Sequence, residues 1–271
     1  MWLALKKVYS HIRGQVLSRV FYRSRCGLRI SGGYSTFQEA ASLCDGYGAS
    51  AILDIVFKSV VDVLEGRGQY ERDGVVFMHR PKNLRIREFL LALQEGSKVI
   101  DFGGGLGGTY INNRDVIPQG VEFIVVEQAG FADIGSRIAA DYGLPVVFTE
   151  EIDALPYNAD LMILSSVLPY IEEPYILLDR LLRMKPQRLV IDRTALKSQG
   201  YQDFDWYLQD CSVSNSFPCS VPIRPILMES LLAKTEEHGY DLIERWYNDF
   251  DARDPEHVGL LFRLRPVLNA R

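Results

Sequence analysis

The sequence has little of what builds metal centres, disulfide frameworks or membrane spans. Its 271 residues include only four histidines and four cysteines, and no CxxC pair, HxxxH motif or Cys/His cluster occurs among them. This usage indicates reduced thiols in a cytosolic protein and predicts no metal site. No apolar run approaches the roughly 18 residues that a membrane-spanning helix needs.

Two further absences concern sorting and nucleic acid. The uninterrupted apolar core of a secretory signal is missing, because Lys6, Lys7, His11 and Arg13 break up the N-terminus. The net charge is −5, and no basic groove, repeat or low-complexity tract is present, so nucleic acid is not an expected partner. A chain of this length that is 47% hydrophobic can bury one large core with a small appended domain.

Acidic residues are missing from the start of the chain, where the first is Glu39. Basic residues and apolar residues at helical spacing share this segment, so residues 1–29 are predicted to form a basic amphipathic helix. Such a helix suits the anionic inner face of the plasma membrane, which would make this a peripheral cytoplasmic protein. The alternative is a helix packed on its own core or on a second copy in a homodimer.

The centre of the sequence is a β-branched run that leads into closely spaced glycines. Residues 98–102 are followed by Gly103, Gly104, Gly105, Gly107 and Gly108. This pattern is typical of a buried parallel strand that turns tightly into a helix. Glycine permits positive φ and lets a ligand lie against the backbone, so the loop indicates the floor of a nucleotide-cofactor site. A turn that holds no ligand is the alternative.

The residues around this loop discriminate between cofactors. A P-loop needs Lys-Ser/Thr after the glycines, but Gly108 is followed by Thr109. Gly103-x-Gly105-x-x-Gly108 satisfies the dinucleotide fingerprint, which keeps NAD as an alternative. Asp101 precedes the first glycine by two residues, where its carboxylate would oppose a pyrophosphate but suit the ammonium and sulfonium of S-adenosylmethionine (SAM). We therefore expect SAM.

The rest of the chain alternates predicted strands and helices, the pattern of a parallel sheet covered on both faces. We expect strands over 122–127, 145–148, 159–166 and 188–194, helices over 133–142, 175–183 and 228–237, and a closing hairpin over 240–247 and 258–264. Residues 195–225 are predicted to be an irregular, aromatic loop that shapes an acceptor site.

Polar residues follow three of these strands. Glu127 ends the second strand, where a carboxylate can bind both hydroxyls of a ribose with Gln128 beside it. Glu150 follows the third strand and could meet an adenine amino group, or could be a solvated helix start. Ser165 and Ser166 end the fourth strand, next to the glycine loop, and are expected to face the transferred group.

Residues 30–95 are predicted to form a helical cap. Ser35 or Thr36, followed by Glu39, resembles a capping box, and helices are expected over 51–64 and 85–94. Between these helices, Tyr70, Arg72 and Asp73 lie in a predicted turn. The turn favours a lid that closes over cofactor or acceptor, or else a static cap.

Three segments together resemble a bacterial family of SAM-dependent methyltransferases: 100–107, 125–128 and 165–170. Matches at 34–40, 70–77 and 192–194 extend the similarity from about residue 30 to the C-terminus. The resemblance implies an α/β class I methyltransferase (Rossmann-like) fold: a mostly parallel seven-stranded sheet, helices on both faces and an N-terminal helical cap. The domains would be residues 1–29, 30–95 and 96–271, the last binding SAM.

The family is associated with surface-polysaccharide (O-antigen type) biosynthesis, which implies a sugar or glycan acceptor methylated at a hydroxyl or amine. A sugar hydroxyl needs a positioned base, for which the candidates are Asp192, Asp73, His79 and His257 in falling order. Asp192 and Arg193 could instead form a structural ion pair. The residues expected to bind the acceptor are Tyr70, Arg72, Tyr170 and Arg193.

Two other classes of protein stay open. One is an NAD-dependent sugar oxidoreductase or epimerase, although Tyr170 and Tyr175 are followed at the fourth position by Pro174 and Asp179, and not by the lysine of the short-chain enzymes. The other is a non-catalytic protein that retains the methyltransferase fold.

Overall fold

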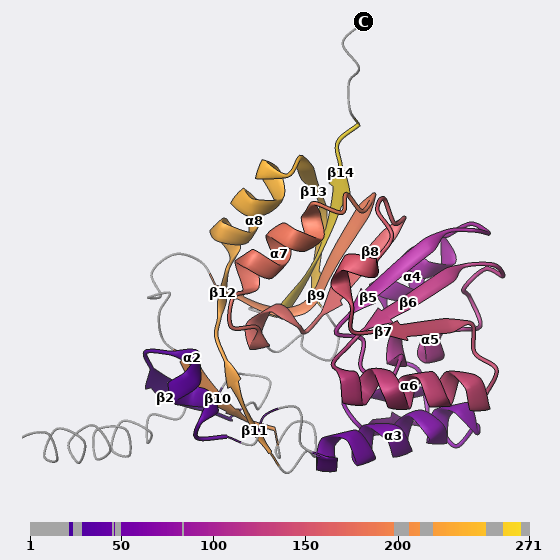
Figure 1. Cartoon of the computed structure of the whole chain (residues 1–271), viewed down its shortest axis with the longest axis horizontal. Coiled ribbons are helices and arrows are strands. Elements are labelled where there is room, and N and C mark those ends of the chain that lie inside the picture. Colours follow the sequence, from indigo (N-terminus) through magenta and orange to yellow (C-terminus); the bar gives the residue numbers. More distant parts are fainter. Residues whose placement is uncertain are drawn as a thin grey trace, which may run out of the picture.

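The computed structural model describes residues 22–23, 29–44, 46, 50–82, 84–197, 206–211, 219–247 and 257–266. In this part of the chain, the main sheet has the strand order β13-β14-β9-β8-β5-β6-β7, and β12 (Ile226–Leu227) pairs with β9 (Figure 1). The parallel strands are β5 (Lys98–Phe102), β6 (Glu122–Val126), β7 (Val146–Thr149), β8 (Leu161–Ser165) and β9 (Arg188–Lys197). β14 (His257–Leu264) runs antiparallel to both of its neighbours, β9 and β13 (Tyr240–Tyr247), so β13 has the same direction as the parallel strands.

This topology confirms the predicted class I sheet, with its antiparallel closing hairpin. The chain runs outward from β5 through β6 to β7, then returns to the other side of β5 with β8 and β9. The strand order therefore reverses between β5 and β8. In open α/β sheets ligands bind beyond the carboxyl ends of the strands at such a reversal, which is where the glycine loop lies.

Helices cover both faces of the sheet because its central strands are apolar on both sides. Val99, Ile163 and Val190 belong to the core under α3 (Ser50–Leu64), α4 (Arg85–Leu91), α5 (Gly108–Asn113) and α6 (Ala129–Asp141). Ile100 and Leu164 point the opposite way, into the core under α7 (Pro174–Leu182) and α8 (Met228–Glu237). Figure 1 shows α7 and α8 side by side, away from α3 and α6.

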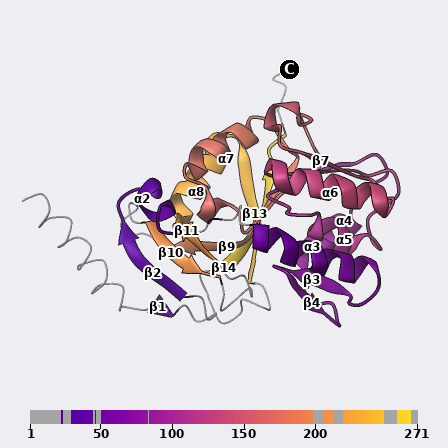
Figure 2. The same ribbon diagram turned by 60° about the horizontal axis from the view of Figure 1, so that its bottom comes forward.

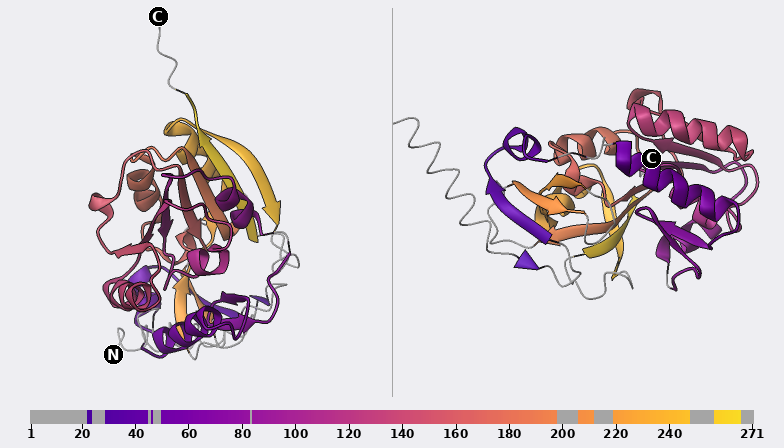
Figure 3. Two further views of the ribbon diagram at one scale, coloured as in Figure 1. Left: turned by 90° about the vertical axis from the view of Figure 1, so that its right-hand side faces the viewer. Right: turned by 90° about the horizontal axis from the view of Figure 1, so that it is seen from below.

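A second, smaller sheet corrects two predictions. Its strand order is β1-β2-β10-β11, formed by β1 (Tyr22–Arg23), β2 (Arg29–Tyr34), β10 (Trp206–Asp210) and β11 (Ser220–Ile223). Residues 30–95 therefore contain a strand as well as helices, and residues 195–225 are not simply an irregular loop. Both strands were missed because the sheet depends on the pairing of β2 with β10, which lie far apart in the sequence, with Trp206 opposite Tyr34. Figures 2 and 3 show this sheet to one side of the main sheet.

Two segments of the predicted cap, α2 and the turn around Asp73, follow their sequence signals more closely. Thr36 caps α2 (Phe37–Ala41): its hydroxyl accepts a hydrogen bond from Glu39 N, while Ser35 N donates to the Glu39 carboxylate. The predicted turn around Asp73 is a hairpin of β3 (Tyr70–Arg72) and β4 (Val75–Phe77). Asp73 and Gly74 both have positive φ, 51° and 77°, as a type I′ turn requires.

The predicted amphipathic helix over residues 1–29 lies outside the described residues, apart from 22–23 and 29, whose backbone is in β1 and β2. Within the residues that are described, no helix is both long enough and apolar enough to cross a membrane.

Candidate functional site

The glycine loop joins β5 to α5 in a conformation that only glycine adopts readily. Gly103, Gly105 and Gly107 have φ values of 72°, 58° and 83°. Gly103 N donates to the carbonyl of Val126 in β6 (2.9 Å), and Gly107 N donates to the carbonyl of Gly104 (3.0 Å). A Cβ atom at Gly105 would meet nothing within 4 Å, so the backbone there is open to a ligand.

Asp101 lies beneath this loop, with 1% of its surface exposed. A Cβ atom at Gly104 would clash with Asp101 Oδ2, so this glycine lets the loop close over the carboxylate. Thr109 at the start of α5 hydrogen-bonds Asp101. Among the described residues, Asp101 Oδ2 is buried without a hydrogen-bond partner. Burial, and secondarily the charge of Glu127, raises the pKa of Asp101 to about 7. The Asp101 carboxylate could therefore accept one more hydrogen bond or contact a cation.

Glu127 follows β6 and contacts the loop from the neighbouring strand. Its Oε1 accepts a hydrogen bond from Gly105 N (3.3 Å), and its Oε2 accepts one from Gln128 N (2.8 Å). Burial raises the pKa of Glu127. The Gln128 side chain is exposed at the start of α6, and Glu150 is exposed just after β7. These predicted cofactor residues share the carboxyl edge of the sheet, though only Glu127 contacts the loop in the bonds that the structure shows.

Ser165 and Ser166 end β8 on the other side of the glycine loop. Ser166 adopts a left-handed φ of 59°, and its N donates to the carbonyl of Asp192 (2.9 Å). Ser165 pairs in register with Asp192. The serines predicted at the end of the fourth strand and the aspartate predicted on the fifth strand therefore lie next to each other.

Asp192 and Arg193 form a β-bulge in β9. The register against β14 shifts between Val258 and Leu260, and Arg193 has a φ of 49°. Asp192 is 5% exposed and accepts a hydrogen bond from Trp246 Nε1 (3.1 Å). Trp246 belongs to β13, so its indole must cross β14 to reach Asp192. It crosses at Gly259, whose missing side chain leaves the space that the indole fills. A bulge beside a ligand-binding edge commonly re-aims side chains, which is its effect here.

The β3–β4 hairpin is attached to the same bulge. Arg193 Nη2 donates to Asp73 Oδ2 (2.6 Å), and Arg72 Nε lies 3.8 Å from the same carboxylate. Tyr70 precedes them in β3, and burial raises the pKa of its hydroxyl. The four residues predicted on the lid and on the fifth strand (Tyr70, Arg72, Asp73 and Arg193) are thus brought together.

The remaining candidates are divided by the fold. Tyr170 follows β8 in the 3-10 turn η2 (Leu168–Tyr170), and its hydroxyl donates to Gln209 of β10 (3.0 Å), so it joins the site to the small sheet. His257 begins β14 opposite Ala195, near the carboxyl end of β9. His79 is exposed behind the hairpin, next to Arg80, whose guanidinium contacts the far end of α5. The structure does not bring His79 to the others.

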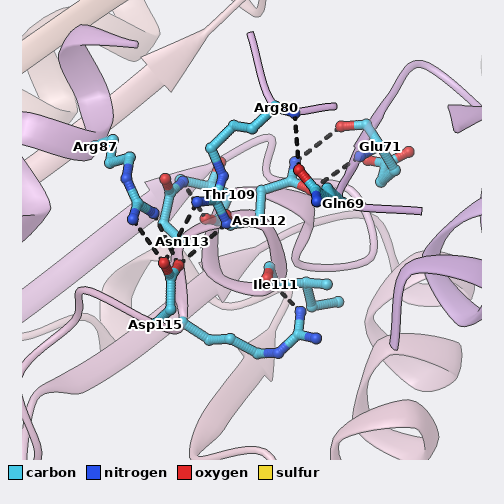
Figure 4. A network of polar contacts seen from close by, with 10 residues as sticks. Gln69, Glu71, Arg80, Arg87, Thr109, Ile111, Asn112, Asn113 and Asp115 are labelled. Atoms are coloured by element: carbon cyan, nitrogen blue, oxygen red, sulfur yellow. Dashed lines mark hydrogen bonds and ion pairs between the residues drawn. The ribbon is translucent and has the colours of Figure 1, made fainter. Parts of the chain in front are cut away.

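A network behind the hairpin attaches it to α5 (Figure 4). Asn112 pairs with the backbone of Glu71: Glu71 N donates to Asn112 Oδ1 (2.9 Å), and Asn112 Nδ2 donates to the carbonyl of Glu71 (2.8 Å). Arg80 and Arg87 both bind Asp115, and this holds the pKa of Asp115 well below its usual range. The hairpin is therefore anchored at its base.

Sequence reasoning missed several residues that contact the predicted ones, chiefly Thr109, Trp246, Gly259 and Glu71. Thr109 directly follows the glycine run, which was a usable signal. Trp246 and Gly259 meet Asp192 only through strand pairing, and no local pattern marks them. In the described part of the chain, no group of three or more His, Cys, Asp or Glu residues is placed to hold a metal ion.

Comparisons with known proteins bear on the fold. No protein-family model matches the sequence, and no curated protein matches it. The structure is similar to that of Burkholderia thailandensis 1,6-didemethyltoxoflavin-N1-methyltransferase, solved with 1,6-didemethyltoxoflavin and S-adenosylhomocysteine (13% identity over 88% of this chain and 96% of that one, TM-score 0.52). It is also similar to the CcbJ methyltransferase from Streptomyces caelestis (16% identity, 78% and 98% covered, TM-score 0.50).

A third solved structure differs from the chain in extent. The mitomycin 7-O-methyltransferase MmcR is matched at 15% identity with a TM-score of 0.46, and the match covers 67% of this chain. The chain spans about half the length of that protein (54%). Together with the strand order and the glycine loop, the first two similarities establish that this chain has the class I methyltransferase fold.

Proposed function

We propose that this protein is a SAM-dependent methyltransferase. The observation that carries the proposal is Asp101: a buried carboxylate under a left-handed glycine loop, with one oxygen that has no hydrogen-bond partner in the described residues. Such an oxygen suits a cationic cofactor and opposes a pyrophosphate, because a second negative charge there would be repelled at low local dielectric. The structurally similar methyltransferase from Burkholderia thailandensis, which was solved with S-adenosylhomocysteine, supports the same choice.

The residues present fit SAM at two points. Asp101 would interact with the cationic end through the glycine loop, and Glu127 lies where a carboxylate accepts the hydroxyls of a ribose. When bound, SAM supplies a methyl group already activated by its sulfonium. The protein then has to hold the acceptor in line, exclude water and remove a proton.

Proton removal is assigned to the end of β9. We assign Asp192 as the general base for an acceptor hydroxyl, with Asp73 as the second candidate: the acceptor oxygen gains the methyl, and its proton moves to the carboxylate. Trp246 fixes one oxygen of Asp192 by its hydrogen bond. Replacing Asp192 with Asn should depress turnover and leave SAM affinity nearly intact, and unchanged turnover would remove Asp192 from this role.

We propose a sugar or glycan as the acceptor, methylated at a hydroxyl or amine. The support is the resemblance of the sequence to a family associated with surface polysaccharides, together with the polar character of the β8 and β9 ends. The structurally similar methyltransferase from Burkholderia thailandensis was solved with 1,6-didemethyltoxoflavin bound, so small-molecule acceptors belong in the same screen. Nucleotide sugars, lipid-linked glycans and heteroaromatic metabolites are the three classes to compare.

The cofactor is tested by calorimetric titration of the full chain with SAM, S-adenosylhomocysteine (SAH) and NAD in parallel. Micromolar binding of SAM and SAH, lost in Asp101→Ala and Glu127→Ala, is the expected result. Binding of NAD alone would overturn the proposal in favour of an oxidoreductase. Binding of none of the three would favour a non-catalytic protein that keeps the fold.

A further inference from the structure

Glu71 is a buried acid that the proposed function does not use. It is the middle residue of β3 and is 8% exposed. Ser59 of α3 donates to Glu71 Oε2 (3.0 Å), and the backbone of Gly74 also hydrogen-bonds the carboxylate. A carboxyl group that costs so much to bury is expected to have a role beyond filling space.

The other oxygen of Glu71 lies against the cofactor loop. A Cβ atom built on Gly108 would be 2.5 Å from Glu71 Oε1, so the carboxylate occupies the space that any side chain at Gly108 would need. Thr109, the next residue, hydrogen-bonds Asp101 from the opposite side. The first residues of α5 are therefore held between two buried carboxyl groups, Asp101 from the sheet and Glu71 from the hairpin.

The protonation of Glu71 is compatible with its position beside other acidic residues. Burial, and then the charge of Asp73, raises the pKa of Glu71 to about 7, whereas Ser59, Gly74 and Arg193 act in the opposite direction. Near neutral pH the group is partly protonated, so it can lie close to Asp73 without two full negative charges in one place.

The same short strand reaches the acceptor side. Arg72 and Asp73 follow Glu71 directly, and Asp73 pairs with Arg193 on the β9 bulge. Because a strand advances about 3.3 Å per residue, only about 7 Å of backbone separates the residue that touches the cofactor loop from the one that touches β9. Asn112 pairs with the Glu71 backbone, so α5 and β3 move together at that point (Figure 4).

We propose that Glu71 is a positioning residue that couples cofactor binding at the glycine loop to the placement of the Arg72–Asp73 turn over the end of β9. A cofactor that fixes Gly105 to Gly108 would fix Glu71, and through it the turn that meets the acceptor. The inference rests on the proposed function, because it needs SAM or SAH to bind this loop. It predicts ordered binding, in which the cofactor prepares the acceptor side.

The test is hydrogen exchange of the full chain with and without SAH, which needs no acceptor. In the wild type, SAH should slow exchange of the glycine-loop amides and also of the hairpin amides, by about tenfold or more. In Glu71→Ala the loop should remain protected, while protection of the hairpin by SAH falls to within about twofold of none. Glu71→Gln keeps the shape and the Ser59 contact and should retain most of the effect.

Asp115→Asn is the matched control. It weakens the Arg80 and Arg87 contacts behind the same hairpin but does not touch the cofactor loop. Its hairpin should exchange faster with and without SAH alike, so that the protection ratio is preserved. A merely structural Glu71 would behave in the same way as this control.

The outcomes separate the coupling from the cofactor itself. Wild-type protein that binds SAH by calorimetry but shows no hairpin protection would overturn the coupling alone. Equal protection in wild type and Glu71→Ala would also overturn it, since the route would not pass through Glu71. Failure of the wild type to bind SAH at all would overturn the proposed function and the coupling together.

Discussion

The two halves of the candidate site are built in different ways. On the cofactor side, Asp101, the glycine loop and Glu127 come from two neighbouring parallel strands, and the interactions run largely through backbone N–H groups. On the acceptor side, the contacts join residues far apart in the chain: Asp73 with Arg193 (120 positions apart), Trp246 with Asp192 (54) and Tyr170 with Gln209 (39).

This difference shows where specificity can change without loss of the cofactor. A site made by backbone turns depends on conformation and admits few substitutions. A site made by side chains from a hairpin, a bulge and a second sheet can be rebuilt residue by residue while the sheet stays intact. Variants on the cofactor side should therefore weaken SAH binding, and variants on the acceptor side should spare it.

The largest effect is expected for Gly103→Ala. The residue has a φ of 72°, and a Cβ atom would lie 2.5 Å from Val167 Cγ2, so the turn must shift. We expect SAH affinity to fall by more than about 100-fold, since the loop backbone would no longer match the ligand. Gly130→Ala is the control: it is exposed in α6 with nothing within 4 Å, and calorimetry should find it unchanged. Wild-type affinity in Gly103→Ala would contradict a cofactor on this loop.

Glu127→Ala comes next. The change removes a carboxylate that is expected to bind a ribose. It also removes the acceptor of the hydrogen bond that Gly105 N donates to Glu127. Loss of charged hydrogen bonds of this kind predicts a decrease in SAH affinity of about 10- to 100-fold. Glu122→Ala, at the exposed start of the same strand, should change affinity less than about twofold, because its ion pair with Lys98 is solvated. Equal effects of the two variants would argue against a specific role for Glu127.

The comparison also explains which parts of the site the sequence could predict. Asp101, the glycines and Glu127 were identified because strand, turn and acid follow each other along the chain. Asp192 and Arg193 of the β9 bulge were predicted as site residues, but the contact of Asp192 with Trp246 was not. Trp246 reaches Asp192 only because β13 and β14 close the sheet and Gly259 leaves room for the indole.

The small sheet was missed for a related reason. Strands β2 and β10 have weak local patterns, and the sheet is completed by their pairing with each other across most of the chain, with Gln209 opposite Ile30. Pairing of that kind is a property of the folded chain, which no window of sequence contains. The main sheet, whose central strands carry runs of buried apolar residues, was predicted to within a few residues at each end.

The affinity for SAM should depend on pH, which gives a further test of the cofactor side of the site. Asp101 has a pKa of about 7 without ligand, and a bound cation favours its ionised form. Binding of SAM should therefore release a proton, and affinity should rise by up to about tenfold per pH unit below pH 7 and level off above it. Calorimetry from pH 6 to 8 in buffers of different ionisation heat measures the released proton directly. Asp101→Asn should bind more weakly and show no such slope; a slope that persists would assign the proton to another group.

The same groups predict a smaller effect on stability without ligand. Burial raises the folded-state pKa of Asp101 and of Glu71 to about 7, above the values of the unfolded chain. Their contribution to the free energy of unfolding is therefore complete below about pH 4 and is lost as the pH rises through 7. Between pH 5.5 and 8 the melting temperature should fall by a few degrees, about the size expected from one or two kcal/mol. The double variant Asp101→Asn, Glu71→Gln should flatten this decrease.

The smallest effect on the cofactor is expected for Trp246→Phe, and this variant is the sharpest test of whether the two halves are separate. Phenylalanine keeps the ring against Phe89, whose centroid lies 5.6 Å away, but removes the N–H that Asp192 accepts. Unfolding should become easier by about 1–3 kcal/mol. SAH affinity should stay within about twofold, because Trp246 and Asp101 share no contact in the described residues.

Turnover, once an acceptor is identified, separates a positioning role of Trp246 from packing. If the indole orients Asp192, Trp246→Phe should lower kcat more than it changes KM for SAM and should move the acidic limb of the pH profile, which reports the general base, while packing alone would leave that limb in place. Gly259→Ala, which displaces the indole without touching Asp192, should reproduce the shift. A decrease in SAH affinity of tenfold or more in either variant would break the comparison, because the sheet would then be transmitting strain from β13 to the glycine loop across β14, β9 and β8.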